Sequence, residues 1–168
     1  EFTLEGISNI QGDFQCIDYF YVKEFVMPFI RVAGDMTIAL NSGSVNTAAE
    51  IEFPKLQEIG GTLTLGTNRN ANNITFPLLK KILGSCSVTT YKLKNDIEFT
   101  NLESIGTDGA DAQIKFEIEA TNILCPKLKT INGKFDIATS SFMFDMEVDK
   151  VSYPNVESIS ENLSITCP

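Results

Sequence analysis

Three carboxylates at alternate positions, Asp145, Glu147 and Asp149, form the best acidic constellation of the sequence. Apolar residues occupy the positions between them, so an extended strand would place all three carboxylates on one face. Carboxylate oxygens are ligands that Ca²⁺ prefers, which makes these residues candidate ligands for calcium or another cation. A solvated strand face that discourages edge pairing explains the same pattern without a metal, and we favour that interpretation.

A second acidic segment, Thr107 to Asp111, contains Asp108, Gly109 and Asp111 and offers the same kind of oxygen ligands. Asp and Gly are also the residues expected in a tight turn, which needs no metal. The sequence therefore predicts no bound metal and no cofactor.

The chain has few of the residues on which enzymes rely for catalysis. Histidine is absent, which removes the usual general base, the Ser-His-Asp and Cys-His systems and most zinc sites. Arginine occurs only at Arg31 and Arg69, and no Asp cluster recurs on neighbouring repeats. We predict that the protein is not an enzyme, and keep a polysaccharide-active β-helix enzyme as an alternative.

A repeated sequence motif, the phrase apolar-Pro-x-Leu-x-x-Ile-x-Gly, predicts the strands on which these residues would lie. Its copies, strict, looser or imperfect, start at Met27, Phe53, Phe76, Phe99, Cys125 and Tyr153. Self-similarity at this period predicts a solenoid. One short strand should precede the Pro position, and a second, with alternating apolar residues, should follow the Gly. Pro suits the first corner because it fixes φ and has no N–H, and Gly is expected to give backbone freedom at the second.

We predict an all-β fold of about six to seven stacked coils, forming a single domain over residues 1–168. One coil buries too little apolar surface to stand alone, so stability should be shared between neighbours. Two interior columns are predicted. The first contains Phe53, Phe76, Phe99, Cys125 and Tyr153, and the second contains Leu63, Cys86, Phe116, Phe135 and Leu163.

Outward residues of the second strand form the candidate partner-binding face, a flat polar surface with small hydroxyls at its centre. Its members are Thr62, Thr64, Ser85, Ser87, Lys115, Glu117, Lys134 and Asp136. Because the face has no aromatic residue on which a sugar ring could stack, a protein laid across it fits better. A face with no partner explains the pattern equally.

The first coil and the cysteines lead to two further predictions. Aromatic residues concentrate between Phe14 and Phe29, which predicts a cap over the first coil. Cys16 and Cys86 fall in strand-interior positions three coils apart, beyond the roughly 7 Å Cα separation that a disulfide spans. We expect all four cysteines, which include Cys125 and Cys167, to be unpaired and chiefly small core residues.

The phrase at residues 53–65 resembles the repeats of receptor L domains, the ligand-binding halves of insulin- and epidermal-growth-factor-type receptors. It is similar also to repeats of fungal cell-wall glycoproteins and of leucine-rich surface lipoproteins of gut-dwelling Gram-negative anaerobes. The resemblance covers Ile7 to Ile165 and implies a right-handed, single-stranded β-helix of the leucine-rich-repeat-like kind. It also implies an extracellular role in adhesion, ligand binding or spacing, with a receptor-type ligand-binding L domain as an alternative.

Charge and hydropathy narrow the expected partners. The net charge of −9 argues against nucleic acid and anionic membranes, which both require a cationic face. No apolar run of about 18 residues exists, so this segment is not expected to insert into a membrane. We expect a monomer at the cell surface or outside the cell that meets a protein or glycan. We also expect this chain to be a piece of a longer surface protein whose anchor lies elsewhere. Asn73 and Asn162 match the glycosylation sequon, relevant in a secreting eukaryote.

Overall fold

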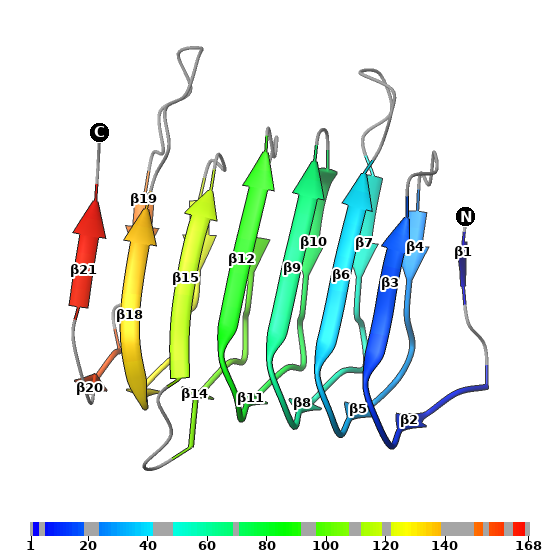
Figure 1. Cartoon of the computed structure of the whole chain (residues 1–168), viewed down its shortest axis with the longest axis horizontal. Coiled ribbons are helices and arrows are strands. Elements are labelled where there is room, and N and C mark those ends of the chain that lie inside the picture. The colour runs from blue at the N-terminus through cyan, green and yellow to red at the C-terminus, as the bar shows by residue number, and fades with distance from the viewer. Residues whose placement is uncertain are drawn as a thin grey trace.

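The fold is built only from β-strands in the part of the chain that the structure describes. This computed structural model describes residues 2–3, 6–18, 24–41, 49–68, 71–91, 97–107, 112–118, 122–138, 150–152, 155–159 and 163–166. Within these residues no helix occurs, and every strand pair is parallel. The strands stack side by side along one axis, from β1 near the N-terminus to β21 near the C-terminus (Figure 1).

Among the described residues, three parallel sheets of seven strands each run along the stack. The first sheet contains β1 (Phe2–Thr3), β4 (Glu24–Val26), β7 (Ala49–Glu52), β10 (Ala71–Thr75), β13 (Ile97–Glu98), β16 (Asn122–Leu124) and β19 (Lys150–Ser152). The second, which we call the narrow sheet, contains β2 (Asn9–Ile10), β5 (Arg31–Val32), β8 (Glu58–Ile59), β11 (Lys81–Ile82), β14 (Ser104–Ile105), β17 (Thr130–Ile131) and β20 (Ser158–Ile159). The third, the broad sheet, contains β3 (Phe14–Asp18), β6 (Met36–Asn41), β9 (Leu63–Asn68), β12 (Cys86–Tyr91), β15 (Ala112–Ile118), β18 (Gly133–Ala138) and β21 (Leu163–Thr166).

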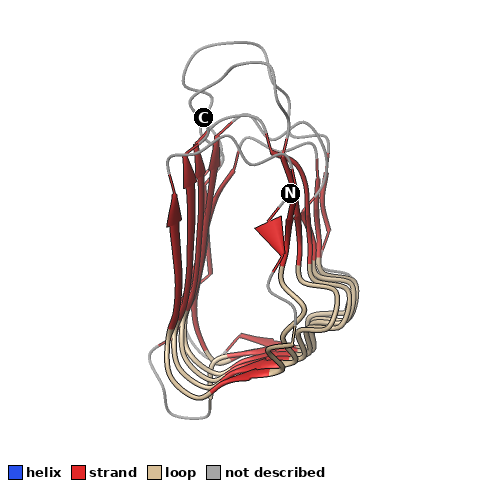
Figure 2. Cartoon of the chain, turned by 90° about the vertical axis from the view of Figure 1, so that its right-hand side faces the viewer, coloured by secondary structure: helices blue, strands red, loops and turns tan. Residues whose placement is uncertain are grey.

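The chain enters the three sheets in turn and then returns to the first sheet beside the strand it left. Seen along the stack, the sheets form three sides around a common interior (Figure 2). This arrangement is a β-solenoid, as the repeated phrase predicts. The prediction of two strands per repeat was incomplete, because a third strand, only two residues long, forms around the Ile of the phrase. Two residues are too few to show alternation in a sequence.

The interior column of phenylalanines is confirmed. Phe53, Phe76 and Phe99 are fully buried, and their ring centroids lie 4.9 and 5.0 Å apart, with interplanar angles of 4° and 6°. This spacing is the distance between neighbouring strands, so each ring stacks on the ring of the next coil. Cys125 takes the following position in the column and is also fully buried, so the thiol stands where another ring would fit.

The second interior column was predicted with one error. Leu63 pairs with Cys86 as expected, but Cys86 pairs next with Ile114, and Phe116 pairs with Val88. Ile114 in turn pairs with Phe135. The connection between Gly106 and β15 is longer than in the other repeats, so the sequence does not show which residue of β15 pairs with Cys86. The error is two residues, and because side chains alternate with a period of two, the same residues stay on the same face of the sheet. The register therefore aligns Leu63, Cys86, Ile114, Phe135 and Leu163; Leu63 and Cys86 are fully buried, whereas Leu163, at the C-terminal end of the stack, is exposed.

The glycine corner has a different physical cause from the one predicted. Gly34, Gly61 and Gly84 are not among the glycines with positive φ. A Cβ on Gly84 would lie 2.7 Å from the carbonyl carbon of Gly61, and a Cβ on Gly61 would lie 2.1 Å from Asp35 Oδ1. At Gly34, Gly61 and Gly84, glycine is required because successive coils touch backbone to backbone, rather than because the backbone needs a left-handed conformation. Gly133, the glycine of a later copy, does have a positive φ of 150°.

The proline corner is joined between coils by asparagine side chains that the sequence analysis did not single out. Asn101 Nδ2 donates a hydrogen bond to the carbonyl of Pro77, and Asn155 Nδ2 donates one to the carbonyl of Pro126. Both asparagines occupy the position directly after the Pro position of their own repeat. They satisfy backbone oxygens that turn away from the ladder of the sheets.

The aromatic segment near the N-terminus is partly regular structure. Phe14 begins β3 and meets Phe29 edge to face with ring centroids 4.8 Å apart, and Phe29 is fully buried. Phe14 and Phe29 therefore belong to the stack itself rather than to a separate cap, and Tyr19 to Tyr21 lie outside the described residues. Among the described residues, no helix is long and apolar enough to span a membrane.

Candidate functional site

The predicted partner-binding face is the outer side of the broad sheet. Parallel pairing places Gln15, Thr37, Thr64 and Ser87 at neighbouring positions, one from each successive strand. Gln15 and Thr64 are exposed, and Thr37 and Ser87 are half-buried. Thr62 and Ser85, which directly precede their strands, are half-buried at the edge of the face. The structure thus brings the four predicted hydroxyl residues together, as expected.

The charged half of this face is shifted from its predicted alignment. Lys115 pairs with Ser87 and Asp136, and Glu117 pairs with Thr89. Lys134 pairs with Gln113 and is exposed. The predicted pairing of Lys115 with Ser85 and Lys134 was wrong by two residues, for the same reason as the Phe116 column. In the register of the sheet, Lys115 is therefore aligned with Asp136.

Aspartates link the coils at the edge of the broad sheet. Asp13 Oδ1 accepts a hydrogen bond of 2.9 Å from the backbone N–H of Asp35, and Asp35 Oδ1 accepts one of 2.7 Å from the N–H of Thr62. Each carboxylate therefore satisfies a backbone donor of the next coil. These aspartates therefore join successive coils of the scaffold.

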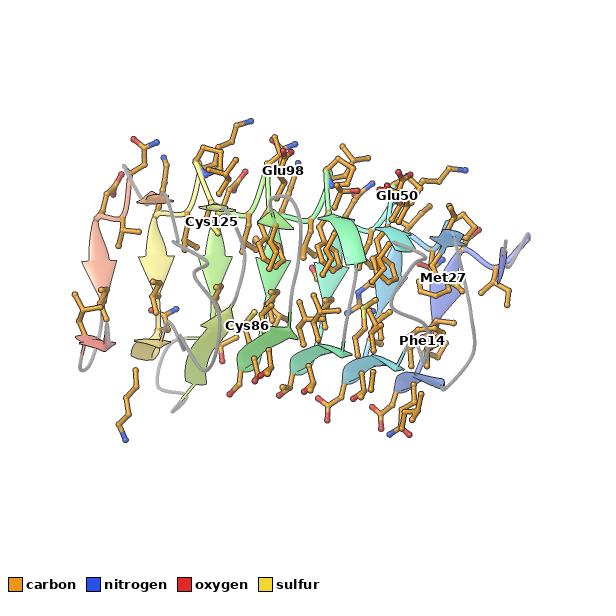
Figure 3. All side chains as sticks on the ribbon, turned by 90° about the horizontal axis from the view of Figure 1, so that it is seen from above. Phe14, Met27, Glu50, Cys86, Glu98 and Cys125 are labelled. Carbon is orange, nitrogen blue, oxygen red and sulfur yellow. The ribbon has the colours of Figure 1, made fainter. Side chains whose placement is uncertain are left out.

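The first sheet carries carboxylates on its outer side. Glu50, Glu52 and Glu98 are half-buried, and Glu52 and Glu98 both pair with Thr75. Glu50 and Glu98 point away from the interior, whereas Cys86 and Cys125 lie between the layers (Figure 3). Among the described residues, no group of three His, Cys, Asp or Glu side chains is close enough to hold a metal ion.

The narrow sheet gathers basic residues that the sequence analysis did not select. Parallel pairing places Arg31, Glu58 and Lys81 on successive strands, and Arg31 Nε donates to Glu58 Oε1 at 2.9 Å. Lys80 lies beside Lys81 and is exposed. The signal was only partly present in the sequence. Glu58 and Lys81 lie four residues after Pro54 and Pro77, whereas Arg31 lies three residues after Pro28. The signal was overlooked because the third strand was not predicted.

The thiols are part of the core. Cys86 and Cys125 are fully buried and free, as predicted, and Cys16 is half-buried; Cys167 lies outside the described residues. Burial raises the pKa of the Cys86 thiol to about 12. Burial, and to a smaller degree the charge of Cys86, raises the pKa of Cys125 far above its ordinary range. Neither thiol is therefore suited to act as a nucleophile at neutral pH, because the reactive form is the thiolate.

Several predicted positions fall beyond what the structure describes. Asp145, Glu147 and Asp149, Asp108 and Asp111, and Asn162 all lie outside the described residues. Asn73 lies in β10 and pairs with Glu50. The calcium hypotheses therefore stay predictions.

Comparisons with known proteins do not identify a family for this fold. No family model, no curated protein and no solved structure matches the chain significantly.

Proposed function

We propose that this chain is a non-catalytic module of a cell-surface or secreted protein that presents the broad sheet to a protein or glycan partner. The supporting observation is the in-register alignment of polar residues on that sheet, from Gln15 through Thr64 to Lys115 and Asp136. The interior columns hold these strands at a fixed spacing, so the face is a rigid pattern of hydroxyls and charges. Such a surface suits recognition of an extended partner by many small polar contacts.

The proposal includes the finer features of the fold that the sequence analysis predicted. We propose that the solenoid is right-handed, with about six to seven coils, in the manner of the receptor L domain-like and leucine-rich-repeat-like proteins that the repeat resembles. Seven strands in each of three sheets support the coil count. A net charge of −9 supports a partner that is neutral or basic, and a location outside the cell, as a monomer, follows from the same resemblance.

A binding screen against arrayed glycans and extracellular-matrix proteins tests the proposal. Thr64 lies at the centre of the face and Lys134 near its charged end, and both are exposed. Thr64→Arg and Lys134→Glu should each weaken a saturable interaction, whereas Lys129→Glu, on the narrow sheet, should leave it unchanged. Binding that survives both broad-sheet variants would contradict the proposed surface. Absence of any binding at about tens of micromolar would leave the chain a spacer.

A further inference from the structure

A hollow of about 230 Å³ opens on the outer side of the narrow sheet. It is lined by Asn9, Ile30, Arg31, Gln57, Glu58, Lys80 and Lys81, which come from four successive strands or the residues before them. It lies on a different sheet from the proposed partner-binding face. An inference about this hollow therefore does not depend on the proposed function.

The lining has the opposite charge to the protein as a whole. Arg31, Lys80 and Lys81 supply three positive charges and Glu58 one negative charge, in a chain whose net charge is −9. Glu58 is already the partner of Arg31. Among the described residues, neither Lys80 nor Lys81 has an ion-pair partner. Two ammonium groups are thus available to an anionic group that enters the hollow.

The remaining lining residues suit a small polar molecule with one less polar side. Ile30 is 39% exposed and offers an apolar surface, while the amides of Asn9 and Gln57 can donate and accept hydrogen bonds. A sugar ring that carries a carboxylate or sulfate matches all three features, with its hydroxyls on the amides and its anion on the lysines.

The chemistry of the lining residues favours a saccharide over an acidic peptide. Lys80 and Lys81 lie on one coil, whereas the neighbouring strand places Glu58 beside Lys81. Sugar hydroxyls can bond to Glu58 and to the amides of Asn9 and Gln57, whereas the side chains of an acidic peptide would bring only further carboxylates to Glu58. We propose that this hollow is a binding site for an acidic saccharide, whose anionic group pairs with Lys80 and Lys81.

Titration with trigalacturonate, followed by the amide NMR signals of the whole chain, tests this site. We expect saturable shifts that include Gln57 and Lys81, and no comparable shifts with the neutral trisaccharide maltotriose. A sulfated disaccharide in a separate titration distinguishes a sulfate from a carboxylate as the preferred anion, and binding of either supports the site. No saturable shift up to about 10 mM of either anionic saccharide would overturn the proposal.

Charge-removing variants locate the interaction. Lys80→Gln/Lys81→Gln should weaken trigalacturonate binding by about tenfold or more, since two charge-assisted hydrogen bonds are lost. Lys81→Arg, which keeps the charge, should retain most of the affinity and shows that the exposed position tolerates change. Lys129→Gln is the matched control, because Lys129 follows Lys80 and Glu103 on successive coils of the same sheet but lies outside the hollow.

Three results would overturn the assignment. Equal loss of binding in Lys129→Gln would indicate general attraction of anions, and equal binding of maltotriose would remove the role of charge. Tighter binding of hexaglutamate than of trigalacturonate would assign the hollow to an acidic peptide instead. Thr64→Arg should leave trigalacturonate binding unchanged, so failure here and failure of the proposed broad-sheet function remain distinguishable.

Discussion

The interior and the outer surface of the stack differ in how strictly their residues repeat. Phe53, Phe76 and Phe99 occupy one interior column and are stacked ring on ring. Directly before the strands of the narrow sheet, the carbonyl and N–H groups of Lys80, Glu103 and Lys129 join successive coils just as regularly, yet their side chains alternate in charge. The backbone repeats equally in both places. The comparison shows that the interior side chains carry most of the architecture, helped at the corners by hydrogen bonds of Asp13, Asp35, Asn101 and Asn155. The remaining outer side chains are free to carry chemistry.

The largest expected effect comes from the interior column. Phe76→Ala should lower the free energy of unfolding by about 3 to 5 kcal/mol, because it opens a cavity between two stacked rings. Chemical denaturation measures this loss. Lys129→Ala, on the outer surface, should change it by less than about 0.5 kcal/mol. A loss of less than about 1 kcal/mol for Phe76→Ala would show that the column does not hold the coils together.

The glycine corner should give the next largest effect. A Cβ at Gly84 would meet the backbone of Gly61 at 2.7 Å, so Gly84→Ala forces two coils apart. We expect a loss of about 1 to 3 kcal/mol, measured by the same denaturation. Gly12→Ala is the matched control, because nothing lies within 4 Å of a Cβ there. If both variants were equally stable, close stacking would not explain the glycines.

The buried thiols should make the free energy of unfolding decrease at alkaline pH. The ordinary pKa of a cysteine is 9.0, and burial raises the pKa of Cys86 to about 12. The folded state therefore keeps a proton that the unfolded chain releases above about pH 9, so stability should fall as the pH rises from there. The expected slope is more than about 1 kcal/mol per pH unit for each buried thiol.

Denaturation at several pH values between about 9 and 11 measures this slope, in the window that the cited pKa values define. Cys86→Ala/Cys125→Ala should have a clearly shallower slope, although it starts from a lower stability because two buried side chains are truncated. An unchanged slope in the double variant would mean that other groups cause the alkaline loss.

The smallest expected effect lies on the outer surface. Arg31 and Glu58 form an ion pair whose side chains are 45% and 33% exposed. Water and salt screen such a pair, so Arg31→Ala should lower the free energy of unfolding by less than about 1 kcal/mol. A loss as large as that of Gly84→Ala would mean that surface charges help to hold the coils together, and would weaken the division between interior and surface.

The sequence predicts the interior well because burial is periodic. The positions of Phe53, Phe76, Phe99 and Cys125 follow from a fixed offset to the Pro position, and all four are buried. The Phe116 alignment failed where the connection between coils changes length, since the sequence alone does not say which residue begins β15. The narrow sheet was missed because strands of two residues leave no pattern.

The candidate sites were less predictable for a related reason. Polar residues on the broad sheet, such as Thr64 and Ser87, could be assigned to an outer face because they alternate with buried neighbours. The hollow on the narrow sheet depends on side chains from four coils that only the stacking brings together. Arg31 and Lys81 are 50 positions apart in the sequence, and both flank Glu58 in the structure.

The increase in the free energy of unfolding that trigalacturonate produces is the most direct test of whether interior residues maintain the fold while outer residues bind the ligand. A ligand at about 100 times its dissociation constant should raise the free energy of unfolding by about 2.7 kcal/mol. We expect Phe76→Leu to lower the stability of the free protein but to keep this increment. Lys80→Gln/Lys81→Gln should keep the stability of the free protein and lose about half of the increment or more, because tenfold weaker binding lowers it to about 1.4 kcal/mol. If the phenylalanine variant instead lost the increment while the lysine variant kept it, the division between interior and surface would be contradicted.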